Sequence, residues 1–227
     1  MVAMTSITIP DPDQRGDLGA FVARVVRLDP AAPVRLRRRA GDGLGMSGPV
    51  TVWAVTPFDA LVTRTVHGGM EPADLTATAT GLLTALTVDR AETVDPGPSC
   101  PWPAPLPPDA GWTAVDDVPV VELERLTDRG LMVARENAGP HGPPAALLDQ
   151  VVLTVSADGS GAAPPVKVPM RCLFALSGMG FLGPSDAADR GVVRVSAASG
   201  WLRLDARYGA VVRRRITVLP LLVAGAG

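Results

Sequence analysis

The sequence predicts an α+β protein whose two halves are separated by a proline-rich linker. In residues 1–92, strand and helix patterns alternate, which predicts an antiparallel sheet with two helices. In residues 113–227, helical segments precede strands, which predicts three helices followed by a β-hairpin or a three-stranded sheet. Residues 93–112 contain seven prolines, which exclude a helix or a central strand because proline fixes φ and lacks an N–H donor.

Composition and charge favour a packed globular protein with no overall attraction to nucleic acid. Of the 227 residues, 47% are hydrophobic and 19% are charged, and the net charge is −2. Because the net charge is slightly negative, any basic surface must be local, and its cations are arginines, which outnumber lysine 20 to 1. The N-terminus lacks the basic and apolar regions of a secretory signal, and the apolar tail at residues 216–227 is too short to span a bilayer as a helix. We therefore expect a soluble cytoplasmic protein, without a membrane partner, in which Cys100 and Cys172 are reduced.

Local patterns define the elements of the N-terminal half. A strand at residues 6–9 precedes a helix at residues 12–28, in which Asp11 is the N-cap and Gln14 reaches back to it. Apolar residues at helical spacing give this helix its buried stripe: Leu18, Phe21, Val22, Val25 and Leu28. Strands are expected at residues 34–39, 50–55 and about 60–66, with Gly68-Gly69 ending the last, and a second helix at about 72–88.

The linker itself is expected to be extended and polyproline-like. Its two tryptophans, Trp102 and Trp112, indicate that parts of it lie on a domain surface. The alternative is that it serves as a proline-rich ligand for an aromatic groove. A connector between the halves is the favoured interpretation.

In the C-terminal half, helices are expected at about residues 119–137, 144–155 and 169–177, with a short strand at 166–168. Four acidic residues are expected at the start of the first helix, where they would complement its dipole: Asp116, Asp117, Glu122 and Glu124. The two halves show no convincing internal repeat in sequence.

Residues 192–218 predict three consecutive strands with one polar face. Alternation places Leu202 and Leu204 on one face and Trp201, Arg203 and Asp205 on the other. We expect Val212 and Ile216 to face inwards. Five arginines are then candidate contacts for an anion or nucleic acid: Arg194, Arg203, Arg207, Arg213 and Arg215. A merely solvated face is the favoured alternative, since Asp205 lies among them and the net charge is negative.

No motif predicts a catalytic residue, a cofactor or a metal. Residues 43–48 match G-x-G-x-x-G, but a strand follows where a dinucleotide site needs a helix, and the other protein-kinase motifs are missing. His67 and His141 have no zinc-ligand spacing. Ser177 and Cys172 have no neighbouring base in sequence.

The order of elements over residues 119–210 resembles a winged helix-turn-helix domain. The resemblance implies that residues 169–177 are a recognition helix in the major groove and that Arg194, Arg203 and Arg207 belong to a wing that contacts the DNA backbone. The helix offers only Arg171 and Ser177 for reading bases, which favours its burial.

The chain as a whole resembles uncharacterised proteins of high-GC actinobacteria. Three phrases carry the resemblance: ITIP at residues 7–10, GWLRL at 200–204 and ARYG at 206–209. This resemblance implies no function.

Three functional hypotheses follow. The leading one is a non-enzymatic protein that acts by binding, through protein–protein interaction or regulation, with possible self-association through the apolar tail at residues 219–223. The second is nucleic-acid binding by a winged-helix-like half. The third is an enzyme whose site forms between the two halves.

Overall fold

A computed structural model of the protein describes residues 5–38, 47–88, 91–137, 144–156, 165–183 and 191–215. In the N-terminal half, the elements are, in order, β1 (Ser6–Thr8), α1 (Pro12–Leu28), β2 (Pro33–Arg38), β3 (Ser47–Val55), β4 (Leu61–Glu71), β5 (Asp74–Thr78), α2 (Ala79–Val88) and β6 (Thr93–Val94). In the C-terminal half, they are β7 (Thr113–Pro119), α3 (Val120–Glu136), α4 (Ala145–Asp149), β8 (Val151–Val155), β9 (Val166–Pro169), α5 (Met170–Gly178), β10 (Val192–Ala198), β11 (Trp201–Ala206) and β12 (Gly209–Arg214).

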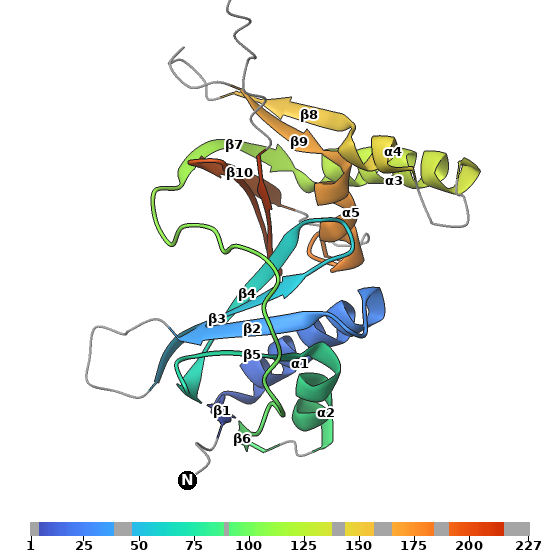
Figure 1. The fold of residues 1–227 in the computed structure, drawn as a ribbon. Coiled ribbons are helices and arrows are strands. Elements are labelled where there is room, and N and C mark those ends of the chain that lie inside the picture. Colours follow the sequence, from blue (N-terminus) through green and yellow to red (C-terminus); the bar gives the residue numbers. More distant parts are fainter. Residues whose placement is uncertain are drawn as a thin grey trace, which may run out of the picture.

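One antiparallel sheet runs through both halves of the chain (Figure 1). Its strand order is β5-β2-β3-β4-β12-β11-β10-β7, with β1 paired to β4 and to β6. The halves meet where β4 pairs with β12, in the register Ala210↔Thr63, Val211↔Val62 and Val212↔Leu61. Outside this sheet, β8 and β9 form a two-stranded ribbon.

The strand order shows an internal repeat that the sequence does not reveal. The series β1-α1-β2-β3-β4 in the N-terminal half has the same order along the chain as β9-α5-β10-β11-β12 in the C-terminal half, although β1 pairs with β4 and β9 pairs with β8. The last strands of the two series, β4 and β12, are neighbours at the centre of the sheet. Each half adds one further strand that leads directly into a helix, β5 into α2 and β7 into α3, and these strands lie at the two ends.

The helices cover one face of the sheet, which we call the inner face (Figure 1). The main core forms there, and α1 contributes Leu18 and Phe21 while α5 contributes Leu173 and Leu176. The rings of Phe21 and Phe181 stack with their centroids 6.3 Å apart, so side chains of both halves share this core. Burial of apolar surface therefore stabilises the two halves together.

The predicted N-terminal helix is confirmed, including its start. The carboxylate of Asp11 accepts hydrogen bonds from the backbone N–H groups of Asp13 and Gln14, and Pro12 occupies the first helical position. Leu18, Phe21, Val22 and Val25 are buried as the spacing predicts.

Two other predictions in this half are wrong. β4 continues through Gly68 and Gly69, because glycine allows β1 to approach: a Cβ on Gly68 would lie 2.2 Å from the Thr8 carbonyl oxygen. The expected helix at residues 72–88 begins only at Ala79, since Asp74–Thr78 pairs with β2.

The prediction of a winged-helix C-terminal half is also wrong. Residues 113–119 form the strand β7, which places Asp116 and Asp117 in the sheet, and residues 151–155 form β8 where a helix was expected. α5 lies where the recognition helix was expected, but Met170 to Leu176 are all buried, so it has no face for DNA. The three strands β10, β11 and β12 belong to the large sheet and do not form a separate wing.

Within the described residues, no helix combines the length and the hydropathy needed to span a membrane.

Candidate functional site

The linker between β6 and β7, residues 95–112, runs along the outer face of the sheet, opposite the helices (Figure 1). A second apolar cluster forms there from Trp53, Leu61, Trp201 and Val212. Four linker residues pack against this cluster: Trp102, Ala104, Leu106 and Trp112. The expectation that parts of the linker lie against a domain surface is therefore confirmed.

Polar contacts hold the two ends of the linker on the protein. Near its start, the Cys100 N–H donates to the carbonyl oxygen of Thr76 on β5 at 3.0 Å, so the linker covers part of that edge strand. Near its end, the Trp112 indole N–H donates to the Pro108 carbonyl oxygen at 3.0 Å, which orients the ring within the linker. The guanidinium of Arg203 lies 5.8 Å from the centroid of the Trp112 ring, in a cation–π contact.

An apolar pocket of about 170 Å³ opens between the linker and the sheet. Its walls come from both: Leu61 of β4, Trp201 of β11 and Val212 of β12 on the sheet side, and Ala104 and Pro105 on the linker side. Charged residues also line it, namely Asp59, Arg213 and Arg214. Arg214 is exposed, and its guanidinium lies 5.8 Å from the centroid of the Trp201 ring. The pocket thus combines aromatic and aliphatic walls with an accessible cation, which is the usual chemistry of a binding pocket.

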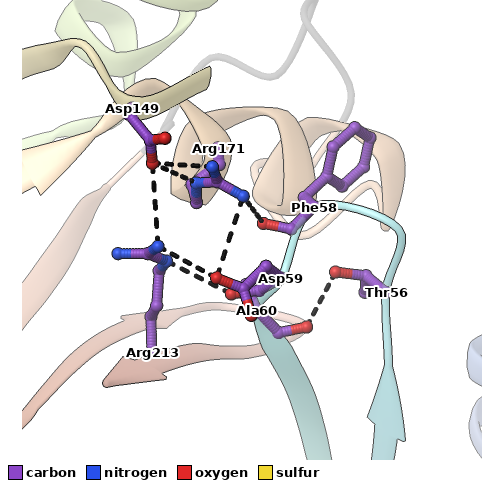
Figure 2. A network of polar contacts seen from close by, with 7 residues as sticks. All are labelled: Thr56, Phe58, Asp59, Ala60, Asp149, Arg171 and Arg213. Atoms are coloured by element: carbon purple, nitrogen blue, oxygen red, sulfur yellow. Dashed lines mark hydrogen bonds and ion pairs between the residues drawn. The ribbon is translucent and has the colours of Figure 1, made fainter. Parts of the chain in front are cut away.

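A network of charged residues lies beside this pocket and joins the two halves (Figure 2). Arg213 on β12 donates to the Asp59 carboxylate at 3.0 Å and to the Asp59 carbonyl oxygen at 3.2 Å. Arg171 on α5 donates to the Asp149 carboxylate at 2.6 Å and to the Phe58 carbonyl oxygen at 3.0 Å. Both guanidinium groups are largely buried, whereas the two carboxylates are open to solvent. The turn between β3 and β4 is therefore tied to both β12 and the start of α5.

The structure divides the five predicted contact arginines instead of gathering them. Arg194 and Arg203 lie on the outer face as predicted, but each is paired with a carboxylate, Arg194 with Asp117 and Arg203 with Asp205. Arg213 faces inwards and is paired with Asp59. Arg207 is exposed, and its guanidinium lies 5.6 Å from the centroid of the Tyr208 ring. For Arg215, the backbone N–H donates to the Gly200 carbonyl oxygen.

The placement of Arg213 and Val212 reverses the prediction for β12. Directly paired residues share a face, and Leu202 pairs with Arg213 while Arg203 pairs with Val212. The cause is the two-residue turn at Arg207 and Tyr208, which exchanges the faces of odd-numbered and even-numbered positions between β11 and β12. Ile216 and the tail at residues 219–223 lie outside the described residues.

Hydrogen bonds from arginine lower the pKa of two carboxyl groups at the ends of the sheet. Arg35 donates to Asp74 and Arg194 donates to Asp117, and each contact holds the carboxyl pKa below its ordinary value. These pairs therefore stabilise the ionised form of each carboxyl group.

The described residues contain no group of histidine, cysteine and carboxylate side chains suited to a metal ion. Both cysteines are free thiols. Burial raises the pKa of Cys172 to about 12, which leaves this thiol protonated and a poor nucleophile at neutral pH. His67 lies within β4, and His141 lies outside the described residues.

Sequence reasoning missed the pocket. Its walls come from segments that are far apart in the chain, and no local motif marks Leu61, Pro105 or Val212. In the sequence, only the two linker tryptophans pointed towards this site. They indicated that the linker packs on the protein, but not which strands it packs against.

Family models match the two halves separately. Residues 3–105 match a domain of unknown function, DUF8010, and residues 107–218 match another, DUF8185. No curated protein matches the chain in sequence. These matches agree with the expectation of an uncharacterised family.

The fold is similar to that of bacterial DNA polymerase sliding clamps. The beta sliding clamp of Caulobacter crescentus is 16% identical, with a TM-score of 0.56 over 95% of this chain and 66% of the clamp. The DNA polymerase III beta subunit of Thermotoga maritima is 11% identical, with a TM-score of 0.53 over 95% of this chain and 65% of that subunit. The sliding clamp of Pseudomonas aeruginosa is 14% identical, with a TM-score of 0.53 over the same shares.

The chain thus spans about two thirds of the length of these clamps. The similarity contradicts the hypothesis that the C-terminal half is a winged-helix regulator or nucleic-acid-binding domain. The sequence therefore matches two adjoining domains of unknown function, and together they adopt a fold similar to that of the bacterial sliding clamps.

Proposed function

We propose that the chain is a clamp-like docking protein that holds a short segment of a partner protein in the apolar pocket. The pocket between the linker and the sheet is the observation that carries this proposal. Among the similar clamps, one from Caulobacter crescentus has PEG bound to a putative beta-motif tethering region, and one from Bartonella birtlesii is bound to griselimycin. Ligand binding to clamps of this fold supports a docking role.

The lining of the pocket defines the segment that would fit. Trp201, Leu61 and Val212 present an apolar surface that favours one large aliphatic or aromatic side chain. Arg214 is exposed beside Trp201 and favours a carboxylate next to that apolar anchor. Tryptophan and arginine are also the residues that most often dominate binding energy at interfaces.

The charges of the helices favour a protein partner over DNA. α1 carries three arginines and two aspartates, and α3 carries three arginines and four acidic residues. α2 carries no charged residue. Because binding to the DNA backbone depends on an excess of cations that replace counterions, these nearly balanced helices give little basis for tight binding to a duplex.

A peptide selection tests the proposal. A displayed library of short random peptides is selected on the full chain, and the affinity of the enriched peptides is measured by calorimetry. We expect enrichment of a large apolar residue next to Asp or Glu. Ala104→Trp should abolish binding because the new side chain fills the pocket, and Arg214→Glu should weaken it by about tenfold or more.

Ala110→Trp is the matched control, since Ala110 lies in the same linker but is exposed and does not line the pocket. It should leave peptide affinity unchanged. Selected peptides that bind Ala104→Trp as well as the unaltered chain, or a selection that yields no binding peptide, would contradict the proposal.

A further inference from the structure

A second hollow, polar and larger, lies on the outer face, with a volume of about 520 Å³. Its lining includes two cross-strand pairs of β3 and β4, namely Thr51 with Thr65 and Trp53 with Thr63. The linker contributes Pro108, Asp109 and Trp112, and the hairpin of β11 and β12 contributes Arg203, Asp205, Arg207 and Tyr208. Its volume lies in the range of sites for small molecules.

One buried group in this hollow has no partner. Thr63 is 3% exposed, and its hydroxyl makes no hydrogen bond among the described residues, although a buried hydroxyl normally has a partner. Because Thr63 lines the hollow, a polar ligand there would be within reach of a group that now lacks a hydrogen bond. Such a contact would remove the cost of the unsatisfied hydroxyl.

The charges around the hollow leave one cation available. Arg64 is paired with Asp17 of α1, and Arg203 is paired with Asp205. Arg207 is exposed and makes no ion pair among the described residues. Asp109 also lines the hollow. Arg207 is thus the cation best placed to bind an anionic group.

Flat side chains line the same hollow. The indole of Trp112 and the phenol ring of Tyr208 each lie beside a guanidinium, that of Arg203 and that of Arg207 respectively. Aromatic rings and guanidinium planes are the surfaces on which nucleobases stack. The hollow therefore joins stacking surfaces, hydroxyls, carboxylates and a free cation within one volume.

We propose that this hollow binds a free nucleotide. The base stacks against Trp112, the phosphate pairs with Arg207, and the ribose hydroxyls donate to the carboxylate of Asp205, since an ionised carboxylate can accept more than one hydrogen bond. Thr63 supplies a further hydrogen bond to the ligand. The apolar pocket does not contain these groups, so this site is separate from the docking site for a protein segment.

Calorimetry with AMP, ATP, adenosine and inorganic phosphate tests the proposal on the full chain. We expect AMP and ATP to bind, and to bind at least about tenfold more tightly than adenosine or phosphate alone, since each fragment loses one of the two main contacts. Arg207→Ala should weaken AMP binding by about tenfold, and Thr63→Val should weaken it by roughly fivefold while preserving shape.

Arg194→Ala is the matched control, because it removes the same charge from a residue on the outer face that does not line the hollow. It should leave the affinity for AMP unchanged. Ala104→Trp should do the same, which separates this site from the proposed protein-docking pocket.

Several results would overturn the nucleotide site. They are the absence of any AMP or ATP binding at millimolar concentration, equal affinity for AMP and phosphate, or equal loss in Arg207→Ala and Arg194→Ala. Binding of a single-stranded oligonucleotide without binding of mononucleotides would also contradict a site for a free nucleotide.

Discussion

The Arg213 guanidinium donates to the Asp59 carboxylate at 3.0 Å, and this contact joins the last strand of the C-terminal half to a turn of the N-terminal half. The two side chains differ in environment, since that of Arg213 is 10% exposed and that of Asp59 is 77% exposed. Asp59 also has a positive φ of 53°, a conformation that Asn and Asp tolerate better than most residues.

Asp59→Asn should destabilise the protein by about 1–2 kcal/mol, because it leaves a largely buried guanidinium with a weaker partner. Asparagine keeps the tolerance for positive φ, so the change tests the charge rather than the turn. Urea unfolding measures the effect. Glu122→Gln is the control, since Glu122 pairs with Arg125 where both side chains are exposed, and it should cost less than about 0.5 kcal/mol. An equal loss of unfolding free energy in the two variants would show that the contact between Asp59 and Arg213 adds no more stability than an exposed ion pair.

Gly209→Ala should cost about 2 kcal/mol or more. Gly209 has a φ of 155°, and a Cβ there would lie 2.5 Å from the Phe181 ring and 2.9 Å from the Thr63 carbonyl oxygen. Gly200→Ala is a matched comparison, because Gly200 also has a positive φ of 72° but its Cβ would meet open space. Thermal and urea unfolding should rank Gly209→Ala as the more damaging change, and the reverse order would refute the close approach of Phe181.

Trp102→Phe should be neutral or slightly stabilising. The indole nitrogen of Trp102 is buried without a hydrogen-bond partner among the described residues, and phenylalanine removes this polar group while keeping an aromatic ring. Trp112→Phe should instead cost about 0.5–1.5 kcal/mol, since it deletes the hydrogen bond to Pro108. Unfolding curves of the two variants provide the comparison, and a larger loss for Trp102→Phe would contradict it.

Cys172 should resist thiol reagents at about pH 8 in the folded protein. Burial raises its pKa to about 12, so at that pH almost no thiolate forms, and the buried sulfur is also inaccessible. Burial also raises the pKa of Cys100, but this residue is only partly buried and should react first. Mass spectrometry after timed labelling measures both sites. Labelling of Cys172 before the protein unfolds would contradict the burial of its thiol.

The contact between Asp74 and Arg35 should make stability depend on acid pH. The hydrogen bond from Arg35 lowers the pKa of Asp74 below its ordinary value of 3.8. Its contribution is therefore fully present above 3.8 and is lost as the pH falls through the lower, folded-state pKa. NMR titration should show the lowered pKa. Asp74→Asn should reduce the loss of stability in acid, and an unchanged acid profile would refute the linkage.

The sequence by itself determined those features that depend on neighbouring residues along the chain. The cap of α1 at Asp11 and the opposite faces of Leu202 and Arg203 in β11 follow from local hydrogen bonding and from the two-residue period of a strand. Seven prolines likewise excluded regular structure from the linker.

Only the tertiary structure decided how these elements pair. The period of a strand relates residues within that strand, whereas the face of the next strand depends on the length and register of the turn between them. The turn at Arg207 and Tyr208 therefore placed Arg213 inside and Val212 outside, against the prediction. The pairing of β4 with β12 and the docking of the linker join residues far apart in sequence, and their stability comes from apolar burial that no local pattern records.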